Sequence, residues 1–332
     1  MDNIDYSIVI PVYFNEGCLK PLVQSLTTVV LHGNQNRRGE IIFVDDGSGD
    51  GSLEELRQIQ NDAPDTVTIL KLTRNFGQAS ALLAGYGHAQ GKCVITISAD
   101  GQEPPETINE MLKAFFDENY EVVICARASR NETSYRIITS RLFYYVMRKL
   151  TFSNMPKGGF DFWLLGRRAL EGLIRNADAH PFLQAQVLWM GFRTKVIPYH
   201  RRERITGASR FSFGKKYTAA LAGILAYSPA PIRLISMAGA TFAILGFVYA
   251  ACIGIGYLIS GNPVKGWSPL MITVLVMGGM QMVMLGVIGE YLWRMSLQVR
   301  RQDRYVIDAV YGRETPESNS SAVANHSAKG TE

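Results

Sequence analysis

Short runs of consecutive apolar residues alternate with helical patterns over the first part of the chain. The helical patterns include apolar positions three or four residues apart between Leu19 and Val29, and a stretch from Ala79 to Gly91. Strands buried on both faces of a parallel sheet read as such continuous apolar runs. The pattern therefore predicts an α/β fold with a mainly parallel sheet covered by helices on both faces. The predicted strands are residues 7–12, 40–44, 67–72, 94–97 and 122–125.

Polar residues follow each of these predicted strands. In open parallel sheets, ligands bind outside the carboxyl ends of the strands. One acidic residue at a strand end is often only a helix cap, but polar ends on successive strands favour a binding site. The residues concerned are Asn15 and Glu16, Asp45 and Asp46, Arg74 and Asn75, Asp100 and Gln102, and Arg127 and Arg130.

Two long stretches without charge, Leu234–Ile259 and Ser268–Gly289, follow in the second part of the chain. A membrane-spanning helix needs roughly 20 mainly apolar residues. The stretches therefore predict a transmembrane hairpin, with a pair of buried helices as the alternative. Basic residues such as Arg233 and Arg294 flank the hairpin, which predicts cytoplasmic ends. With no signal peptide at the N-terminus, the expectation is a multi-pass protein of the inner membrane with its first domain on the cytoplasmic side.

These patterns divide the chain into four segments. Residues 1–227 form the α/β domain, 228–295 the hairpin, 296–314 a basic segment and 315–332 a polar, disordered tail. Within the first segment, apolar and basic residues intermingle over 136–150, which fits either an interfacial helix or a helix facing the core. Small residues in the second span permit close helix packing and a homo-oligomer: Gly278, Gly279, Gly286 and Gly289.

Composition supports this division. The mean hydropathy of +0.03 over 332 residues averages a polar domain with stretches that carry no charge. The four cysteines have no Cys-x-x-Cys spacing, which argues against a disulfide framework and a structural zinc site. The net charge of +5 is modest, and its clustering near the hairpin suits an anionic lipid surface rather than nucleic acid.

The residues at the strand ends limit the chemistry. No Gly-x-Gly-x-x-Gly follows the first strand and no Gly-Lys-Ser/Thr loop occurs, which argues against a dinucleotide site and a P-loop. Carboxylates suit a ribose, a base edge or a hard cation. Asp100 and Gln102 offer oxygen ligands for Mg²⁺ or Mn²⁺, and a nucleoside diphosphate could supply the others. The set favours a nucleotide sugar as donor.

Four segments resemble the successive motifs of family 2 glycosyltransferases with the Rossmann-like GT-A fold: residues 10–16, 44–52, 73–77 and 99–106. More narrowly, the chain is similar to the polyprenyl-phosphate glycosyltransferases, which include dolichol-phosphate mannose synthase and the bactoprenol-phosphate glucosyltransferases. The segment 203–212 and the two-helix tail also match that group. The resemblance covers nearly the whole chain except about the last twenty residues.

The resemblance implies roles for individual residues. The donor would be bound by Pro11, Tyr13, Asn15, Glu16, Asp45, Asp46, Arg74, Asn75, Gly77, Asp100 and Gln102. Of these, Asp100 and Gln102 would bind the divalent cation. The acceptor phosphate would meet Arg127, Arg130, Arg204, Ser209 and Arg210, of which Arg130 and Arg210 could instead contact anionic head groups. Asp161 would join Asp100 as a catalytic carboxylate, as a base or an orienting group, with a helix cap as the alternative.

The chain departs from the family pattern at several places. Ser98 stands where the family has the first Asp of Asp-x-Asp, so one expected metal ligand is missing. Phe14 is an extra residue in the first motif, and Arg210 replaces a common lysine. The segment 180–186 is less basic than in relatives.

The function implied is a membrane-bound, inverting transfer of a hexose from a nucleotide sugar, first UDP-glucose, to undecaprenyl phosphate. The product would donate sugar to cell-envelope glycans, with a flippase and a second glycosyltransferase as partners. GDP-mannose, UDP-galactose and UDP-N-acetylhexosamine are alternative donors. A catalytically silent membrane scaffold is the alternative from another class. A processive polysaccharide synthase is disfavoured because no Gln-x-x-Arg-Trp motif occurs.

Overall fold

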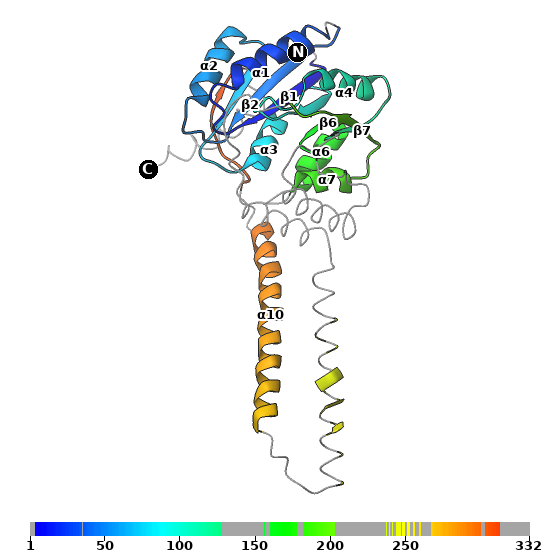
Figure 1. Cartoon of the computed structure of the whole chain (residues 1–332). Helices are drawn as coiled ribbons and strands as arrows, with labels where there is room; N and C mark the ends of the chain where they lie inside the picture. Colours follow the sequence, from blue (N-terminus) through cyan, green and yellow to red (C-terminus); the bar gives the residue numbers. More distant parts are fainter. Residues whose placement is uncertain are drawn as a thin grey trace, which may run out of the picture. The chain divides into compact units, whose positions relative to one another are not determined.

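An eight-stranded mixed sheet forms the centre of the first of two units in this computed structural model (Figure 1). The structure describes residues 4–34, 36–127, 156, 160–177, 182–202, 267–299 and 303–312, together with scattered helical positions between 237 and 259. The first unit comprises Met1–Ala220 and Asp303–Glu332, and the second comprises Leu221–Gln302. Residues 136–150 and 315–332, for which an amphipathic helix and a disordered tail were expected, lie outside the described residues.

The sheet has the strand order β7-β5-β6-β4-β1-β2-β3-β8. Strands β1 to β4 run parallel, and β5 runs parallel to β7. Strand β6 is antiparallel to β4 and β5, and β8 is antiparallel to β3. The strands are β1 (Tyr6–Val12), β2 (Gly39–Asp45), β3 (Val67–Leu72), β4 (Cys93–Thr96), β5 (Val122–Arg127), β6 (Phe162–Gly166), β7 (Thr194–Tyr199) and β8 (Ile307–Tyr311). The predicted α/β fold with a mainly parallel sheet is confirmed.

Helices pack on both faces of the sheet, as the double-sided burial of its strands requires. On one face, Ile8 and Ile10 of β1 share an apolar cluster with residues of the helices α1, α2 and α4. On the other face, Gly85 of α3 approaches β1 so closely that a Cβ there would lie 2.4 Å from Val9 Cγ1. The helices of this unit are α1 (Leu19–Leu26), the π-helix η1 (Thr27–Leu31), α2 (Ser52–Asp62), α3 (Gln78–His88), α4 (Glu106–Phe116), α6 (Arg167–Asn176) and α7 (Leu183–Trp189).

Strand β8 lies within the segment 296–314, which the sequence indicated only to be basic. It closes the β3 edge of the sheet through the ladder from Ile69↔Tyr311 to Leu72↔Ile307. A 2.5 Å ion pair joins Lys71 to Asp308 across this ladder. The chain after the second unit is thereby returned to the sheet of the first.

The second unit contains helix α10 (Trp267–Val299). The expected hairpin with spans 234–259 and 268–289, and with it the multi-pass inner-membrane localisation, is wrong: within the described part of the chain, no helix is both long and apolar enough to cross a membrane. The expectation rested on the freedom of both stretches from charged residues.

Candidate active site

Strands β1 to β5 and β7 all point their carboxyl ends to the same edge of the sheet. The strand ends and loops at this edge carry every candidate site residue that the structure describes. Pro11 lies half-buried in β1, opposite Val44 of β2. The site residues Arg130, Arg204, Ser209 and Arg210 lie outside the described residues.

Asp45 is the last residue of strand β2 and is buried. Its Oδ1 accepts a hydrogen bond from the backbone N–H of Ser48 at 3.2 Å. Its Oδ2 is buried and has no hydrogen-bond partner among the described residues. Burial raises the pKa of Asp45 above its ordinary value, although hydrogen bonds from Ser48 oppose the shift. Since buried polar atoms are nearly always paired in native proteins, this oxygen is suited to accept a hydrogen bond from a ligand.

Asp46, the next residue, uses both of its carboxylate oxygens within the protein. Oδ1 accepts from the backbone N–H of Phe76 at 2.7 Å, and Oδ2 accepts from that of Gly77 at 2.9 Å. Gly77, the residue before α3, has a φ of 96°, a conformation that favours glycine. Burial raises the pKa of Asp46, and these two hydrogen bonds lower it in part. Asp46 therefore joins the loops that follow β2 and β3.

Arg74 and Asn75 lie in the loop that Asp46 holds. Gly47 makes the close approach possible, because a Cβ at this residue would lie 2.8 Å from the backbone carbonyl carbon of Arg74. The Arg74 guanidinium lies 4.0 Å from the centroid of the Phe76 ring. Both Arg74 and Asn75 are exposed at the sheet edge, where a ligand can reach them.

The loop after β1 accommodates the extra residue of the first motif by a left-handed turn. Phe14 has a φ of 56°, and its backbone N–H donates to Ser48 Oγ at 3.2 Å. The side-chain oxygen of Asn15 accepts from the N–H of Tyr13 at 2.9 Å, which leaves the Tyr13 side chain 40% exposed.

Glu16 is engaged at the start of a neighbouring helix. Its Oε2 accepts from the backbone N–H of Gly51 at 3.0 Å, immediately before α2. A carboxylate at a helix N-terminus is stabilised by the unpaired amides and the helix dipole. The contact ties the loop after β1 to α2.

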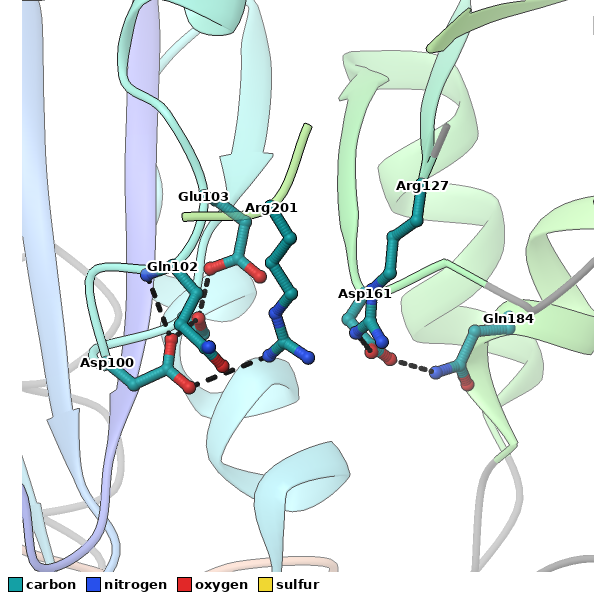
Figure 2. Close-up of polar contacts among 8 residues, drawn as sticks. Asp100, Gln102, Glu103, Arg127, Asp161, Gln184 and Arg201 are labelled. Atoms are coloured by element: carbon teal, nitrogen blue, oxygen red, sulfur yellow. Dashed lines mark hydrogen bonds and ion pairs between the residues drawn. The ribbon is translucent and has the colours of Figure 1, made fainter. Parts of the chain in front are cut away.

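Asp100 follows β4 and anchors an acidic cluster (Figure 2). Its Oδ1 accepts from Ser98 Oγ at 2.7 Å and from the backbone N–H of Gln102 at 3.2 Å. Its Oδ2 lies 3.6 Å from Nη2 of Arg201, the second residue after β7. Arg201 was not predicted as a site residue.

Glu103 is the second carboxylate of this cluster, and no site role was predicted for it. It is buried, hydrogen-bonds Ser98 through Oε2, and has an Oε1 without a partner among the described residues. Burial, and then the charge of Asp100, raise the pKa of Glu103. Ser98, which stands where the family has a carboxylate, thus links the carboxyl groups of Asp100 and Glu103.

The cluster offers a limited set of donors for a cation. Among the residues that the structure describes, no three His, Cys, Asp or Glu side chains form a group that could hold a metal ion. Gln102 Nε2 donates to the carbonyl of Arg202 at 3.3 Å. The carboxylate of Asp100 and the amide oxygen of Gln102 are nonetheless ligands of the kind that Mg²⁺ and Mn²⁺ prefer. They fit a divalent cation whose remaining ligands come from substrate phosphates and water.

Asp161, which directly precedes β6, is held by two neighbours (Figure 2). Arg127 at the end of β5 donates from Nη2 to its Oδ2 at 3.1 Å, and Gln184 of α7 donates from Nε2 to its Oδ1 at 3.1 Å. Burial alone would lower the pKa of Arg127, but the charge of Asp161 and a hydrogen bond with Tyr199 raise it. The structure therefore brings together two residues from the sequence prediction, Arg127 and Asp161.

The two groups share one site. The buried carboxyl of Glu103 interacts electrostatically with both Asp100 and Asp161, and this contributes to its raised pKa. Burial and the charge of Glu103 also raise the pKa of Tyr199, to about 12. Neither Gln184 nor Tyr199 was predicted as a site residue, and the apolar pattern around them carries no signal of this role. The signal for Glu103 was its place in the motif segment 99–106.

Comparison with known proteins adds four findings. Residues 7–174 match the family described as Glycosyl transferase family 2. An uncharacterized glycosyltransferase of Bacillus subtilis strain 168, YkcC, is 34% identical over 93% of this chain and 95% of its own length. The SfII prophage-derived bactoprenol glucosyl transferase of Shigella flexneri is 31% identical over 91% of this chain and 96% of its own length. Glucosyl-3-phosphoglycerate synthase from Mycobacterium tuberculosis, solved with Mn²⁺, UDP-glucose and phosphoglyceric acid, has a similar fold: the TM-score is 0.50 at 16% identity, over 67% of this chain and 78% of that one.

Proposed function

We propose that this chain, which belongs to glycosyl transferase family 2, moves a glucosyl group from a nucleoside diphosphate sugar to a polyprenyl phosphate. That it is a glycosyltransferase follows from the family and from the GT-A-like fold. Glucose and the lipid phosphate are proposed because a relative that matches over almost its whole length is a bactoprenol glucosyl transferase.

One observation supports the proposal most directly. A cluster of acidic residues that could bind a cation faces an ion pair that could bind an anionic acceptor. Asp100 belongs to the first group, and the Arg127 to Asp161 pair forms the second. A free carboxylate would repel a phosphate acceptor, but Arg127 neutralises Asp161 at 3.1 Å. The site can therefore hold negative charge on both substrates.

On the donor side, Asp45 and Tyr13 would bind the nucleoside. Asp45 contributes a buried oxygen that no described residue hydrogen-bonds, and Tyr13 contributes an exposed ring. Asp100 and Gln102 would hold the divalent cation, which when bound neutralises the diphosphate. Arg74 and Asn75 are exposed at the same edge and would contact the donor from the neighbouring loop.

The reaction proposed is a single displacement. A phosphate oxygen of the acceptor attacks the anomeric carbon, the bond from that carbon to the diphosphate oxygen breaks, and its electron pair leaves with the nucleoside diphosphate. A phosphomonoester has a second pKa of about 6, so at neutral pH it is mostly a dianion and needs no strong base. We therefore assign Asp161 the role of orienting Arg127 and the acceptor. One displacement inverts the anomeric centre, so an α-linked donor yields a β-linked product.

The test is transfer of labelled glucose from UDP-glucose to polyprenyl phosphate by the purified full chain with Mn²⁺ or Mg²⁺. The expected product is a lipid-linked glucose that is absent without the lipid phosphate. GDP-mannose, UDP-galactose and UDP-N-acetylglucosamine are assayed in parallel as competing donors. Absence of lipid-linked sugar with all four donors would overturn the proposed acceptor, and transfer from another donor alone would overturn glucose.

A further inference from the structure

Arg201 has hydrogen-bonding capacity at the site that the described residues do not use. Its Nη2 lies 3.6 Å from Asp100 Oδ2, longer than the roughly 2.7–2.9 Å of a charge-assisted hydrogen bond. Its Nε is buried and has no hydrogen-bond partner among the described residues. A buried N–H without an acceptor is unfavourable, and a guanidinium carries five donors in a planar fork. The observed contact with Asp100 therefore satisfies Arg201 only in part.

The neighbouring Arg202 differs from Arg201, because it forms an ordinary surface ion pair. Its Nη2 donates to both carboxylate oxygens of Glu106, at 2.9 and 2.8 Å, and its side chain is 49% exposed. Its backbone N–H donates to the carbonyl of Gln102 at 2.9 Å. This backbone contact joins the segment after β7 to the loop of Asp100. It thereby holds the backbone of the neighbouring Arg201 beside that loop.

Figure 2 shows the Arg201 guanidinium directed between the Asp100 cluster and the Asp161 group. A cation that binds Asp100 takes the carboxylate with which Arg201 is paired. The guanidinium then needs a new anion, and a phosphate matches its fork better than it would match a lysine ammonium. We infer that Arg201 is a phosphate-contacting residue of the transfer reaction, paired with Asp100 until the substrates bind. The inference rests on the proposed function, since that function supplies the phosphates.

Two phosphates could be the partner: the leaving diphosphate of the donor and the phosphomonoester of the acceptor. Arg201→Ala is compared with Arg202→Ala, which removes the adjacent charge outside the site. The affinity for UDP with Mn²⁺ is measured by calorimetry, and the KM for polyprenyl phosphate from steady-state transfer. We expect Arg201→Ala to weaken one of them by roughly 10- to 100-fold, the usual range for a lost charge-assisted hydrogen bond. Weakened UDP binding identifies the diphosphate, and a raised acceptor KM identifies the acceptor.

A second readout tests the pairing with Asp100 without any turnover. Mn²⁺ binding to the substrate-free chain is followed by electron paramagnetic resonance. Removal of the competing guanidinium is expected to tighten Mn²⁺ binding several-fold in Arg201→Ala and to leave Arg202→Ala unchanged. Equal Mn²⁺ affinities in the wild type and Arg201→Ala would overturn the pairing.

Arg201→Lys keeps the charge and serves if the alanine variant does not fold, as judged by circular dichroism. A lysine loses the planar fork, so it is expected to weaken the same step by a smaller factor. The inference is overturned if a folded Arg201 variant binds UDP and uses the acceptor as the wild type does. A wild type that transfers no sugar to polyprenyl phosphate contradicts the proposed function instead, and the UDP and Mn²⁺ measurements still decide the role of Arg201 toward the donor.

Discussion

The carboxylate Oδ2 of Asp46 lies 2.9 Å from the backbone nitrogen of Gly77, across the gap between two strand ends. Asp45, its neighbour in the chain, instead has a buried oxygen without a hydrogen-bond partner in the described part of the chain. Two consecutive acidic residues thus have different tasks. Asp46 holds two loops together, and Asp45 is the one that can serve a ligand.

Substitution of each of these residues by asparagine should separate the two tasks. Asp46→Asn replaces an acceptor by an N–H₂ group that faces a backbone donor, and should lower the free energy of unfolding by about 1.5–3 kcal/mol. Asp45→Asn should change it by less than about 1 kcal/mol but weaken UDP binding roughly 10-fold. Urea unfolding and calorimetry measure the two effects. The opposite ranking in stability would show that the contacts of Asp46 do not hold the loops.

Asp45 should also impose a pH dependence on stability. Burial raises its pKa above the ordinary 3.8. Between 3.8 and the raised value the folded chain binds more protons than the unfolded chain, so the free energy of unfolding falls as pH rises through this window. Asp45→Asn lacks this titration and should therefore gain stability relative to the wild type from about pH 4 upward. Urea unfolding across the acid range measures the difference, and a constant difference between the two proteins would contradict the prediction.

Ser98 should stabilise the acidic cluster of Asp100 and Glu103. Ser98→Ala removes the hydroxyl that bonds both Asp100 and Glu103. It leaves a buried carboxyl without that partner, at a cost of about 1–3 kcal/mol in the free energy of unfolding. Thermal unfolding should show a lower Tm than the wild type. An unchanged Tm would mean that Glu103 finds another partner.

Ser98→Asp restores the family's first carboxylate and gives a complementary prediction. A third carboxyl group beside Asp100 and Glu103 should lower the Tm without metal, by about 2–8 °C, because like charges repel. Mn²⁺ should then raise the Tm more than it does in the wild type. Ser98→Asn, of similar size but uncharged, is the control and should lack the added metal response.

The five strands predicted from apolar runs are all present, with ends within two residues of those expected. For example, the predicted strand 67–72 coincides with β3, because a strand buried on both faces is a nearly continuous run of apolar residues. The edge strands β7 and β8 escaped prediction because they are only partly buried, so that Lys195, Pro198 and Asp308 interrupt the apolar pattern. Strand β6 was not predicted either, although it is buried along its whole length, so half-burial at an edge accounts for two of the three missed strands.

Some residues of the site could be predicted from the sequence and others could not. Asp45, Asp100 and Arg127 were predictable because they end or follow strands of known direction. Gln184 and Arg201 were not, since they reach Asp161 and Asp100 from 23 and 101 residues away along the chain (184 − 161 and 201 − 100). Those encounters depend on the position of β6 between β4 and β5, and on β7 beside β5. The residues around Gln184 and Arg201 do not indicate this order of strands in the sheet.

Asp161 should be the residue whose loss most affects turnover without affecting donor binding. Asp161→Asn keeps the size of the side chain but removes the charge that orients Arg127, so kcat should fall by about 100-fold while the donor KM stays within about 3-fold. Gln184→Ala removes only the second hydrogen bond and should lower kcat by about 10-fold. Asp117→Asn is the matched control, because the Arg37 to Asp117 ion pair has the same 3.1 Å length but lies at the surface away from the site. Transfer kinetics with varied donor and acceptor measure these effects, and a kcat for Asp161→Asn equal to that of Asp117→Asn would remove Asp161 from the reaction.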